Sequence, residues 1–241
     1  TMVSECVADI VAATTLINDG GSIQAAGKLT IESKNNKVIN KNNAEIISGA
    51  ELVITAYSDI ENTESTLYAG GIMSLDSTNG AIKSIGDANN IALVQAVGLI
   101  DMYAHSSIEN NYSTVYSDST LNLDGHSISN SNGNLSALSS IVLNTAGSIS
   151  NTGIIESGLY ITAKNGTGYL SSFTNSGLVM ALGALDIKAQ SINNNMTNFD
   201  GGGLVAGTAM TLTAGSSGIS NQRGKITSEG NLTVVSSGHL Y

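Results

Sequence analysis

The chain repeats one short sequence frame about ten times, and this repetition constrains its fold more than any other feature. Ser148–Ala163 reads SISNTGIIESGLYITA, and Gly218–Val235 reads GISNQRGKITSEGNLTVV. Each stretch starts with apolar-x-Asn, continues through a short apolar segment among Ser and Gly, and ends on alternating apolar residues. Self-similarity at a period of roughly 20–50 residues indicates a solenoid, a propeller or a similar array.

The repeat unit holds three segments. The apolar residues that open the units recur every 19 to 27 residues and are Leu16, Val38, Ile60, Ile82, Ile108, Ile128, Ile149, Phe173, Ile192 and Ile219. The second segment centres on Ile23, Ile46, Leu67, Leu93, Val115, Leu135, Ile154, Leu178, Leu204 and Ile226. The third alternates, in the pairs Leu29/Ile31, Leu52/Ile54, Met73/Leu75, Ile100/Met102, Leu121/Leu123, Ile141/Leu143, Leu159/Ile161, Leu185/Ile187, Met210/Leu212 and Leu232/Val234.

Alternation with a period of two residues predicts strands with one buried face, and no stretch sustains a helical stripe. A sandwich or barrel of hairpins would repeat once per hairpin, with Asn-Gly or Asp-Gly turns. Here the same strand type returns every third segment. The sequence therefore predicts an all-β parallel β-helix over residues 1–241, with about ten coils of roughly 22 residues and three short strands per coil. Stacking at ~4.8 Å per coil gives a rod about 50 Å long.

Asparagine follows the opening apolar residue by two positions in nine of the ten units, and the fourth unit has Ser84 instead. The nine are Asn18, Asn40, Asn62, Asn110, Asn130, Asn151, Asn175, Asn194 and Asn221. Residues i and i+2 of a strand point the same way, so an inward apolar residue implies an inward asparagine. Inward carboxamides can bond from coil to coil as a structural ladder. The alternative is an outward asparagine that makes local turn bonds.

Composition excludes several classes of function. The formal net charge is −10 and Arg223 is the only arginine, which argues against a nucleic-acid partner. No apolar run approaches the ~20 residues that span a bilayer, so we expect no membrane insertion. Cys6 is the only cysteine, and His105, His126 and His239 lie far apart in sequence. We therefore expect no metal site and no cofactor.

The units INDGGSIQAAGKLTIES (17–33) and ISNTGIIESGLYITA (149–163) resemble the haemagglutinin repeats of filamentous-haemagglutinin-like exoproteins, which Gram-negative bacteria export by two-partner secretion. The resemblance covers residues from about 10 to 237. It implies a right-handed β-helix that is secreted to the bacterial cell surface. It also implies a non-enzymatic adhesive rod, or the stalk of a contact-dependent growth inhibition toxin. The partner would be a protein or glycan receptor on a host or neighbouring cell.

The same resemblance predicts how the segment relates to a longer protein. The family's amino-terminal secretion domain engages the outer-membrane secretion partner and carries an Asn-Pro-rich motif. This chain contains no proline. We therefore expect it to be an internal piece of a longer rod.

Some β-helices act on polysaccharides, so outward carboxylates on the third segment are the best catalytic candidates. Asp76 and Asp101 should lie ~8 Å apart, one coil up and two residues along, within the ~6.5–9.5 Å range of inverting glycosidases. Asp124 is the next acidic residue in this series. No cluster of arginine or histidine accompanies them, so a carbohydrate-active enzyme remains an alternative hypothesis. A trimeric phage or autotransporter spike is a third.

Specific contacts are expected at exposed aromatic residues and at inserted loops. Tyr68 and Tyr116 occupy equivalent places in their coils, and Tyr103 and Tyr160 should point outward on the third strand. Tyr112 lies near Tyr116. Three units carry extra residues, and insertions of this kind often form the binding face of a solenoid. The three insertions are Gly86–Asn90, Asn165–Ser171 and Asn195–Gly202.

Overall fold

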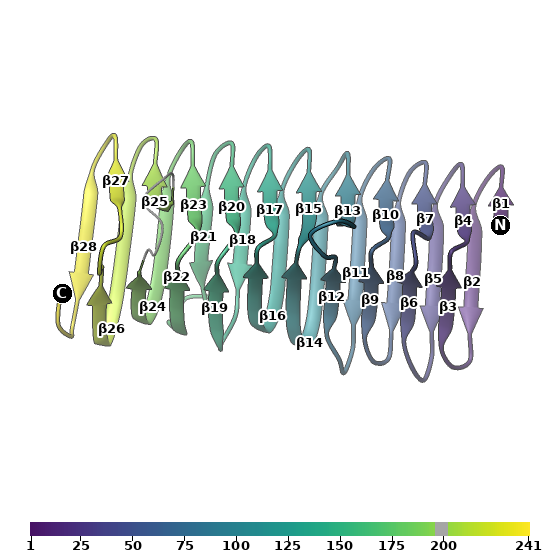
Figure 1. Cartoon of the computed structure of the whole chain (residues 1–241), viewed down its shortest axis with the longest axis horizontal. Helices are drawn as coiled ribbons and strands as arrows, with labels where there is room; N and C mark the ends of the chain where they lie inside the picture. Colours follow the sequence, from purple (N-terminus) through teal and green to yellow (C-terminus); the bar gives the residue numbers. More distant parts are fainter. Residues whose placement is uncertain (196–201) are drawn as a thin grey trace.

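The computed structural model describes residues 1–195 and 202–241 and shows a parallel β-solenoid. Its strands form three ladders along one axis, and the two ends of the chain lie at opposite ends of the rod (Figure 1). Each strand inside the rod pairs in parallel with the equivalent strands of the coils before and after it, as β5 does with β2 and β8. The prediction of a parallel β-solenoid of about ten coils is confirmed.

The bounds of the strands follow the three predicted segments. The first ladder contains β3 (Leu16–Asp19), β6 (Val38–Lys41), β9 (Ile60–Thr63), β12 (Ile82–Ile85), β19 (Ser148–Asn151) and β22 (Leu170–Asn175). The second ladder contains β1 (Met2–Ser4), β4 (Ser22–Ala25), β7 (Glu45–Ser48), β10 (Thr66–Ala69), β13 (Ala92–Ala96), β15 (Ser113–Ser117), β17 (Asn134–Ala137), β20 (Ile154–Ser157), β23 (Leu178–Ala181), β25 (Gly203–Ala206) and β27 (Ile226–Ser228). The third ladder contains β2 (Ala8–Ala12), β5 (Leu29–Ser33), β8 (Leu52–Ala56), β11 (Met73–Ser77), β18 (Ile141–Asn144), β21 (Ile161–Lys164) and β28 (Leu232–Ser236).

Four longer strands belong to two ladders at once. They are β14 (Ile100–Asn111), β16 (Leu121–Ser131), β24 (Leu185–Asn194) and β26 (Met210–Ser220). Each runs from the third ladder around a corner into the first ladder of the next coil. The pairing register slips at the corner, between Ala104 and Ser107 in β14. In these coils the predicted third strand and the following first strand are therefore one continuous strand.

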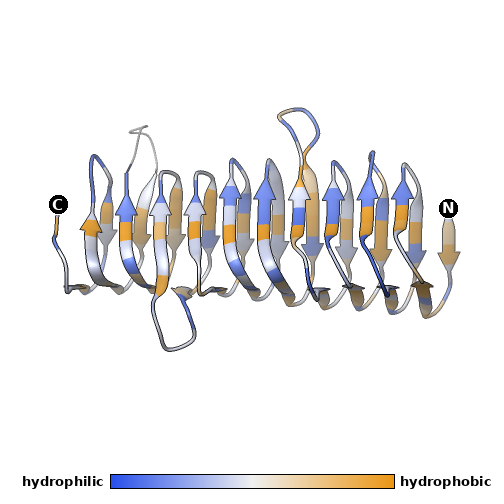
Figure 2. Cartoon of the chain, turned by 90° about the horizontal axis from the view of Figure 1, so that it is seen from below, coloured by the Kyte–Doolittle hydropathy of each residue, from blue (hydrophilic) through white to orange (hydrophobic). Residues whose placement is uncertain are grey.

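The core is a set of columns in which apolar side chains of successive coils stack directly. Leu52 pairs with Leu29 on one side and with Met73 on the other, and all three are fully buried. Figure 2 shows the resulting apolar bands at matching heights along the strands. Each column buries its side chains only because a coil lies above and below, so the fold depends on stacking rather than on any single coil.

The structure corrects the predicted register of three second-ladder strands. The predicted central residues were Leu93, Ile154 and Leu178, but the structure buries their neighbours. The buried residues are Val94, Ile155 and Val179. Pairing decides between two adjacent apolar residues, because a slip of one position turns every side chain of a strand to the opposite face. Leu67, for example, pairs with Val94.

The predicted third-ladder pairs are wrong in one coil and half-exposed in another. Leu159 lies at a corner and is 47% exposed, while Ile161 and Ala163 are buried in β21. Ile161 pairs with Ile141, which sets this register. Leu232 and Val234 of β28 are 48% and 42% exposed. Their strand pairs with β26 on one side only.

Two inserted loops leave the rod on opposite sides (Figure 2). Residues 86–91 connect β12 to β13, and residues 165–169 connect β21 to β22. The third predicted insertion, Asn195–Gly202, falls largely outside the described residues. Within the part of the chain that the structure describes, no helix is long and apolar enough to cross a membrane.

Candidate functional site

The nine predicted asparagines form a column inside the rod, at the end of the first ladder. Eight of them are at most 6% exposed. In the first three coils Asn18 Nδ2 donates to Asn40 Oδ1 at 2.8 Å, and Asn40 Nδ2 donates to Asn62 Oδ1 at 2.9 Å. The same bond then joins, at 2.7–2.8 Å, the successive members Asn110, Asn130, Asn151, Asn175, Asn194 and Asn221.

Each carboxamide of the column also holds the backbone at the corner between the first and second ladders. Asn130 Nδ2 lies 3.2 Å from the carbonyl oxygen of Gly133 in its own coil and 2.9 Å from that of Ile154 in the next. An amide nitrogen carries two hydrogens, so one serves the column and the other the corner carbonyls. These buried, uncharged groups are placed to stabilise the corner rather than to meet a ligand.

The column is interrupted at Ser84, in the coil that carries the 86–91 loop. Ser84 Oγ lies 2.5 Å from Ser113 Oγ, and Ser113 Oγ donates to the carbonyl oxygen of Ala92 at 3.0 Å. Asn110 Oδ1 is buried and finds no donor in the described residues. A void of about 10 Å³ lies beside Ser84 and Asn110. Serine is too short to bridge the gap, so the carboxamide of the next coil loses its partner.

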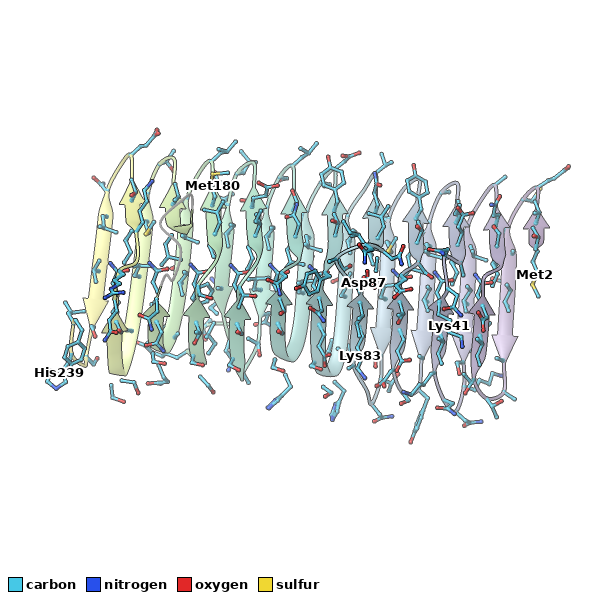
Figure 3. The ribbon with its side chains drawn as sticks, viewed as in Figure 1. Met2, Lys41, Lys83, Asp87, Met180 and His239 are labelled. Atoms are coloured by element: carbon cyan, nitrogen blue, oxygen red, sulfur yellow. The ribbon has the colours of Figure 1, made fainter. Side chains whose placement is uncertain are left out.

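The 86–91 loop forms one wall of an open hollow of about 410 Å³, which we call the Tyr112 hollow. The loop is fixed by Asp87, whose Oδ1 accepts the backbone N–H groups of Asn89 at 2.7 Å and Asn90 at 2.8 Å. These two bonds lower the pKa of Asp87. Figure 3 places Asp87 on this loop at the outer surface of the rod. The hollow is lined by Asp87, Ala88, Ile91, Tyr112, Ser113, Thr114, Asn132, Gly133 and Asn134.

Tyr112 is a bulky residue at a corner position where several coils adopt a left-handed backbone conformation. Its φ is 44°, and the equivalent corner residues Glu64 and Asn132 have φ values of 50° and 52°. Asparagine tolerates this left-handed conformation, whereas a bulky aromatic residue rarely adopts it. Tyr112 is also 40% exposed. A strained and exposed aromatic residue beside a hollow is a reason to look for function there.

The second loop forms one wall of another hollow, of about 400 Å³, which we call the Asp124 hollow. Asn144 connects the wall to the floor: its Nδ2 donates to Asp124 Oδ2 at 2.8 Å, and its Oδ1 accepts the N–H of Gly166 at 2.8 Å. Desolvation, together with the charge of Asp124, raises the pKa of Asp101. The lining residues are Asp101, Asn122, Leu123, Asp124, Val142, Asn144, Lys164 and Gly166.

The predicted catalytic carboxylates lie on the outer face of the third ladder, near this hollow. Asp76 pairs with Tyr103, and Tyr103 pairs with Asp124 two coils from Asp76. Asp101 pairs with Ser74, so it stands one coil up and two residues along from Asp76 as predicted. Only Asp101 and Asp124 line the hollow, and Asp76 does not. Among the described residues, no group of three or more His, Cys, Asp or Glu is placed to hold a metal ion.

The tyrosines fall into different surroundings. Tyr68 and Tyr116 both pair with Gln95 and so lie two coils apart in one row of the second ladder. Tyr103 points outward on β14 and is 49% exposed. Tyr160 is exposed but lies at a corner just before β21, not on the strand as predicted. The row of Tyr68 and Tyr116 is separate from the residues that line the Tyr112 hollow.

Sequence reasoning missed the carboxamides that line the two hollows. Asn132 and Asn134 line the first, and Asn122 and Asn144 the second. The signal was present, since each lies within two coils of an inserted loop. It was hidden because asparagine and serine are common throughout the chain, and only coil-to-coil pairing shows which ones face a hollow.

Comparison with known proteins agrees with the repeat and the fold. The haemagglutinin repeat matches residues 9–92, 86–168 and 158–236. Comparisons with curated proteins and with solved structures gave no match. The three matched ranges span nearly the whole solenoid, with its stacked coils and its asparagine column. The chain therefore belongs to the haemagglutinin repeat family, whose β-helices are typical of filamentous-haemagglutinin-like exoproteins.

Proposed function

We propose that this chain is a non-enzymatic, adhesive rod segment of a large secreted exoprotein on a Gram-negative cell surface. The continuous solenoid supplies a stiff spacer, and the inserted loops supply the contacts. The observation that carries this proposal is that both described loops wall an open hollow, next to coils whose remaining features are structural. Weak contacts repeated along a rod add up through multivalency.

The proposed partner is a protein or glycan receptor on a host or neighbouring cell. Export would use an outer-membrane secretion partner that recognises a different part of the exoprotein. The family and the net negative charge of the chain support this proposal. The stalk of a contact-dependent inhibition toxin uses the same rod, with the active part elsewhere in the protein.

A binding measurement tests the adhesive role. Labelled, purified segment is applied to panels of host cells and Gram-negative bacteria, with low-salt and high-salt washes. We expect saturable binding that survives the high-salt wash, because the two hollows are lined mainly by neutral polar and apolar groups. Absence of binding by a segment with a β-rich circular dichroism spectrum would refute adhesion here and leave the spacer role.

The carbohydrate-active alternative rests on Asp76 and Asp101, which lie on neighbouring coils of the third ladder. It predicts release of sugars from polysaccharides, and it predicts that Asp76→Asn and Asp101→Asn abolish that release. Unchanged turnover in both variants would end this alternative. The placement of Asp76 outside the Asp124 hollow already argues against a shared substrate.

A further inference from the structure

We propose that Asn165 is a site of spontaneous deamidation, and that the hydrogen bond from the N–H of Gly166 to Asn144 controls its rate. This inference rests on the chemistry of the 165–169 loop and does not depend on the adhesive function. Asparagine followed by glycine is the sequence most prone to this reaction, because glycine has no side chain to hinder attack by its backbone nitrogen. The chain contains three such pairs, which begin at Asn79, Asn132 and Asn165.

The reaction needs only the chain itself and water. The backbone nitrogen of Gly166 loses its proton and attacks Asn165 Cγ, which closes a succinimide ring. The Cγ–Nδ2 bond breaks, and the nitrogen leaves as ammonia after it takes up that proton. Water then opens the ring. Attack at Cγ restores the normal backbone and gives aspartate, whereas attack at the backbone carbonyl carbon gives isoaspartate, in which the main chain runs through Cγ.

The turn at residues 165–168 leaves this pair open to solvent. The carbonyl oxygen of Asn165 accepts the N–H of Gly168 at 2.6 Å, and Gly166 follows Asn165 in the turn with a φ of 51°. Asn165 and Gly166 are both exposed. No heavy atom lies within 4 Å of the position that a Cβ of Gly166 would take. The backbone nitrogen of Gly166 therefore has room to move onto Asn165 Cγ.

The other two pairs are held between coils. Gly80 and Gly133 are buried, whereas Gly166 is exposed. Gly80 and Gly133 each accept a backbone N–H at 2.9 Å, from Ser106 and Ile154 respectively. A Cβ at either buried glycine would collide with atoms of a neighbouring coil. Ring closure at these pairs requires a local opening of the rod, which costs more free energy than movement of an exposed loop.

One hydrogen bond restrains the attacking nitrogen. Asn144 Oδ1 accepts the N–H of Gly166 at 2.8 Å, and Asn144 is itself held by Asp124, which accepts from its Nδ2 at 2.8 Å. Lys188 restrains the same loop at a second point, because its Nζ donates to the carbonyl oxygen of Thr167 at 2.6 Å. Only the bond to Asn144 involves the nitrogen that attacks. Loss of the proton requires this bond to open, so Asn144 slows the reaction.

Deamidation changes the Asp124 hollow. It adds a carboxylate at residue 165, directly before Gly166 in the wall of the hollow. Asp101 and Asp124 already line this hollow. The isoaspartate product also lengthens the loop backbone by one methylene group. The wall of the hollow therefore gains negative charge and changes its path as the protein ages.

Peptide mapping by mass spectrometry tests the proposal. The intact segment is held at neutral pH, and samples taken over time are scored for aspartate and isoaspartate at the three pairs. We expect Asn165 to react at least ~10-fold faster than Asn79 or Asn132, because those two react only after a costlier opening. In the same chain unfolded in urea, the three pairs should react at similar rates. A folded protein in which Asn165 stays intact, or reacts no faster than the other two, would overturn the proposal.

Asn144→Ala tests the controlling bond. The variant frees the N–H of Gly166 and should speed the reaction at Asn165 several-fold, while the rate at Asn79 stays unchanged. Asn122→Ala is the matched control, since Asn122 lines the same hollow but is not the acceptor for Gly166. Equal rates at Asn165 in the two variants would contradict control by Asn144.

Discussion

At the scale of single residues, the repeated asparagine constrains the structure, because its side chain forms hydrogen bonds from coil to coil. Asn151 accepts from Asn130 and donates to Asn175, and its amide also meets two corner carbonyls. The column therefore fixes the distance between coils and the path of each corner at once. In a chain with few charges and many glycines, these directed hydrogen bonds specify how one coil pairs with the next, which apolar columns alone do not do.

Asn151→Ala should lower the stability of the fold by about 2–5 kcal/mol, because it removes the bonds of Asn151 to Asn130 and Asn175 and leaves two buried corner carbonyl groups without its amide. The measurement is the midpoint of urea unfolding followed by circular dichroism. Ser150→Ala is the matched control, since Ser150 is the exposed neighbour on the same strand and should change stability by less than ~0.5 kcal/mol. Equal effects of the two variants would contradict a structural column.

A second constraint at this scale is the charge cluster on the first-ladder side. Asp59 lies 2.9 Å from Lys37 and 3.2 Å from Lys83, and it accepts the backbone N–H of Ala81. Desolvation alone would raise the pKa of Asp59, but these three partners outweigh it and lower the pKa to about 2. The cluster joins three successive coils through ion pairs, because Lys37, Asp59 and Lys83 come from consecutive units.

Asp59→Asn should therefore destabilise the protein in a way that depends on pH. The folded-state pKa lies below the value of 3.8 for a free carboxyl group, so the contribution is complete above about pH 4 and is lost as the pH falls through about 2. After allowance for solvent screening we expect a loss of about 1 kcal/mol at neutral pH. Thermal unfolding of both proteins from pH 7 down to pH 2 measures it. A difference that stays constant over this range would exclude the ionised Asp59 as the cause.

At the scale of the coil, the interruption of the asparagine column at Ser84 coincides with one of the inserted loops. The fourth unit lacks the asparagine that ties down its own corner, and this corner carries the 86–91 loop. The neighbouring carboxamide of Asn110 is left without a donor for its oxygen. The coil that interrupts the asparagine column is thus also the coil whose loop walls the Tyr112 hollow.

Ser84→Asn should complete the column and raise stability by ~1–2 kcal/mol, because the new amide donates to Asn110 Oδ1 and reaches into the adjoining void. Ser84→Ala, which removes the hydroxyl and adds no donor, should lower it. The comparison is made by thermal unfolding of both variants. A lower midpoint for Ser84→Asn than for Ser84→Ala would show that this coil cannot accept the column.

The number of coils and the three ladders could be predicted, because the pattern behind each recurs in every unit of the sequence. Two of the three predicted insertions, at 86–91 and 165–169, could be predicted because they lengthen the spacing between units. The register of β13, β20 and β23 could not. In each case two adjacent apolar residues, such as Leu93 and Val94, satisfied the pattern equally, and the neighbouring coil decided between them. The hollows could not be predicted either, since they depend on how corners of different coils meet. Asn134 and Asn144 line the hollows only because corners of different coils pack together there.

At the scale of the whole molecule, the chain divides into a repeated scaffold and a few departures from the repeat. Stacked apolar columns explain the scaffold, together with the asparagine column, which nine of the ten units supply. The departures are the loops and the exposed residues around them. We propose that the scaffold provides stiffness and that the departures provide contact.

The most direct test removes one departure and keeps the scaffold. In the variant, residues 86–91 are replaced by a single asparagine, the residue found at the corner position of Asn132. The measurement is saturation binding of the wild type and the variant to the cells that the wild type recognises. We expect the variant to keep its β-rich circular dichroism spectrum and to be at least as stable to heat as the wild type. We expect it to lose at least a large part of the binding. A folded variant that binds with wild-type affinity would contradict the assignment of contact to this loop.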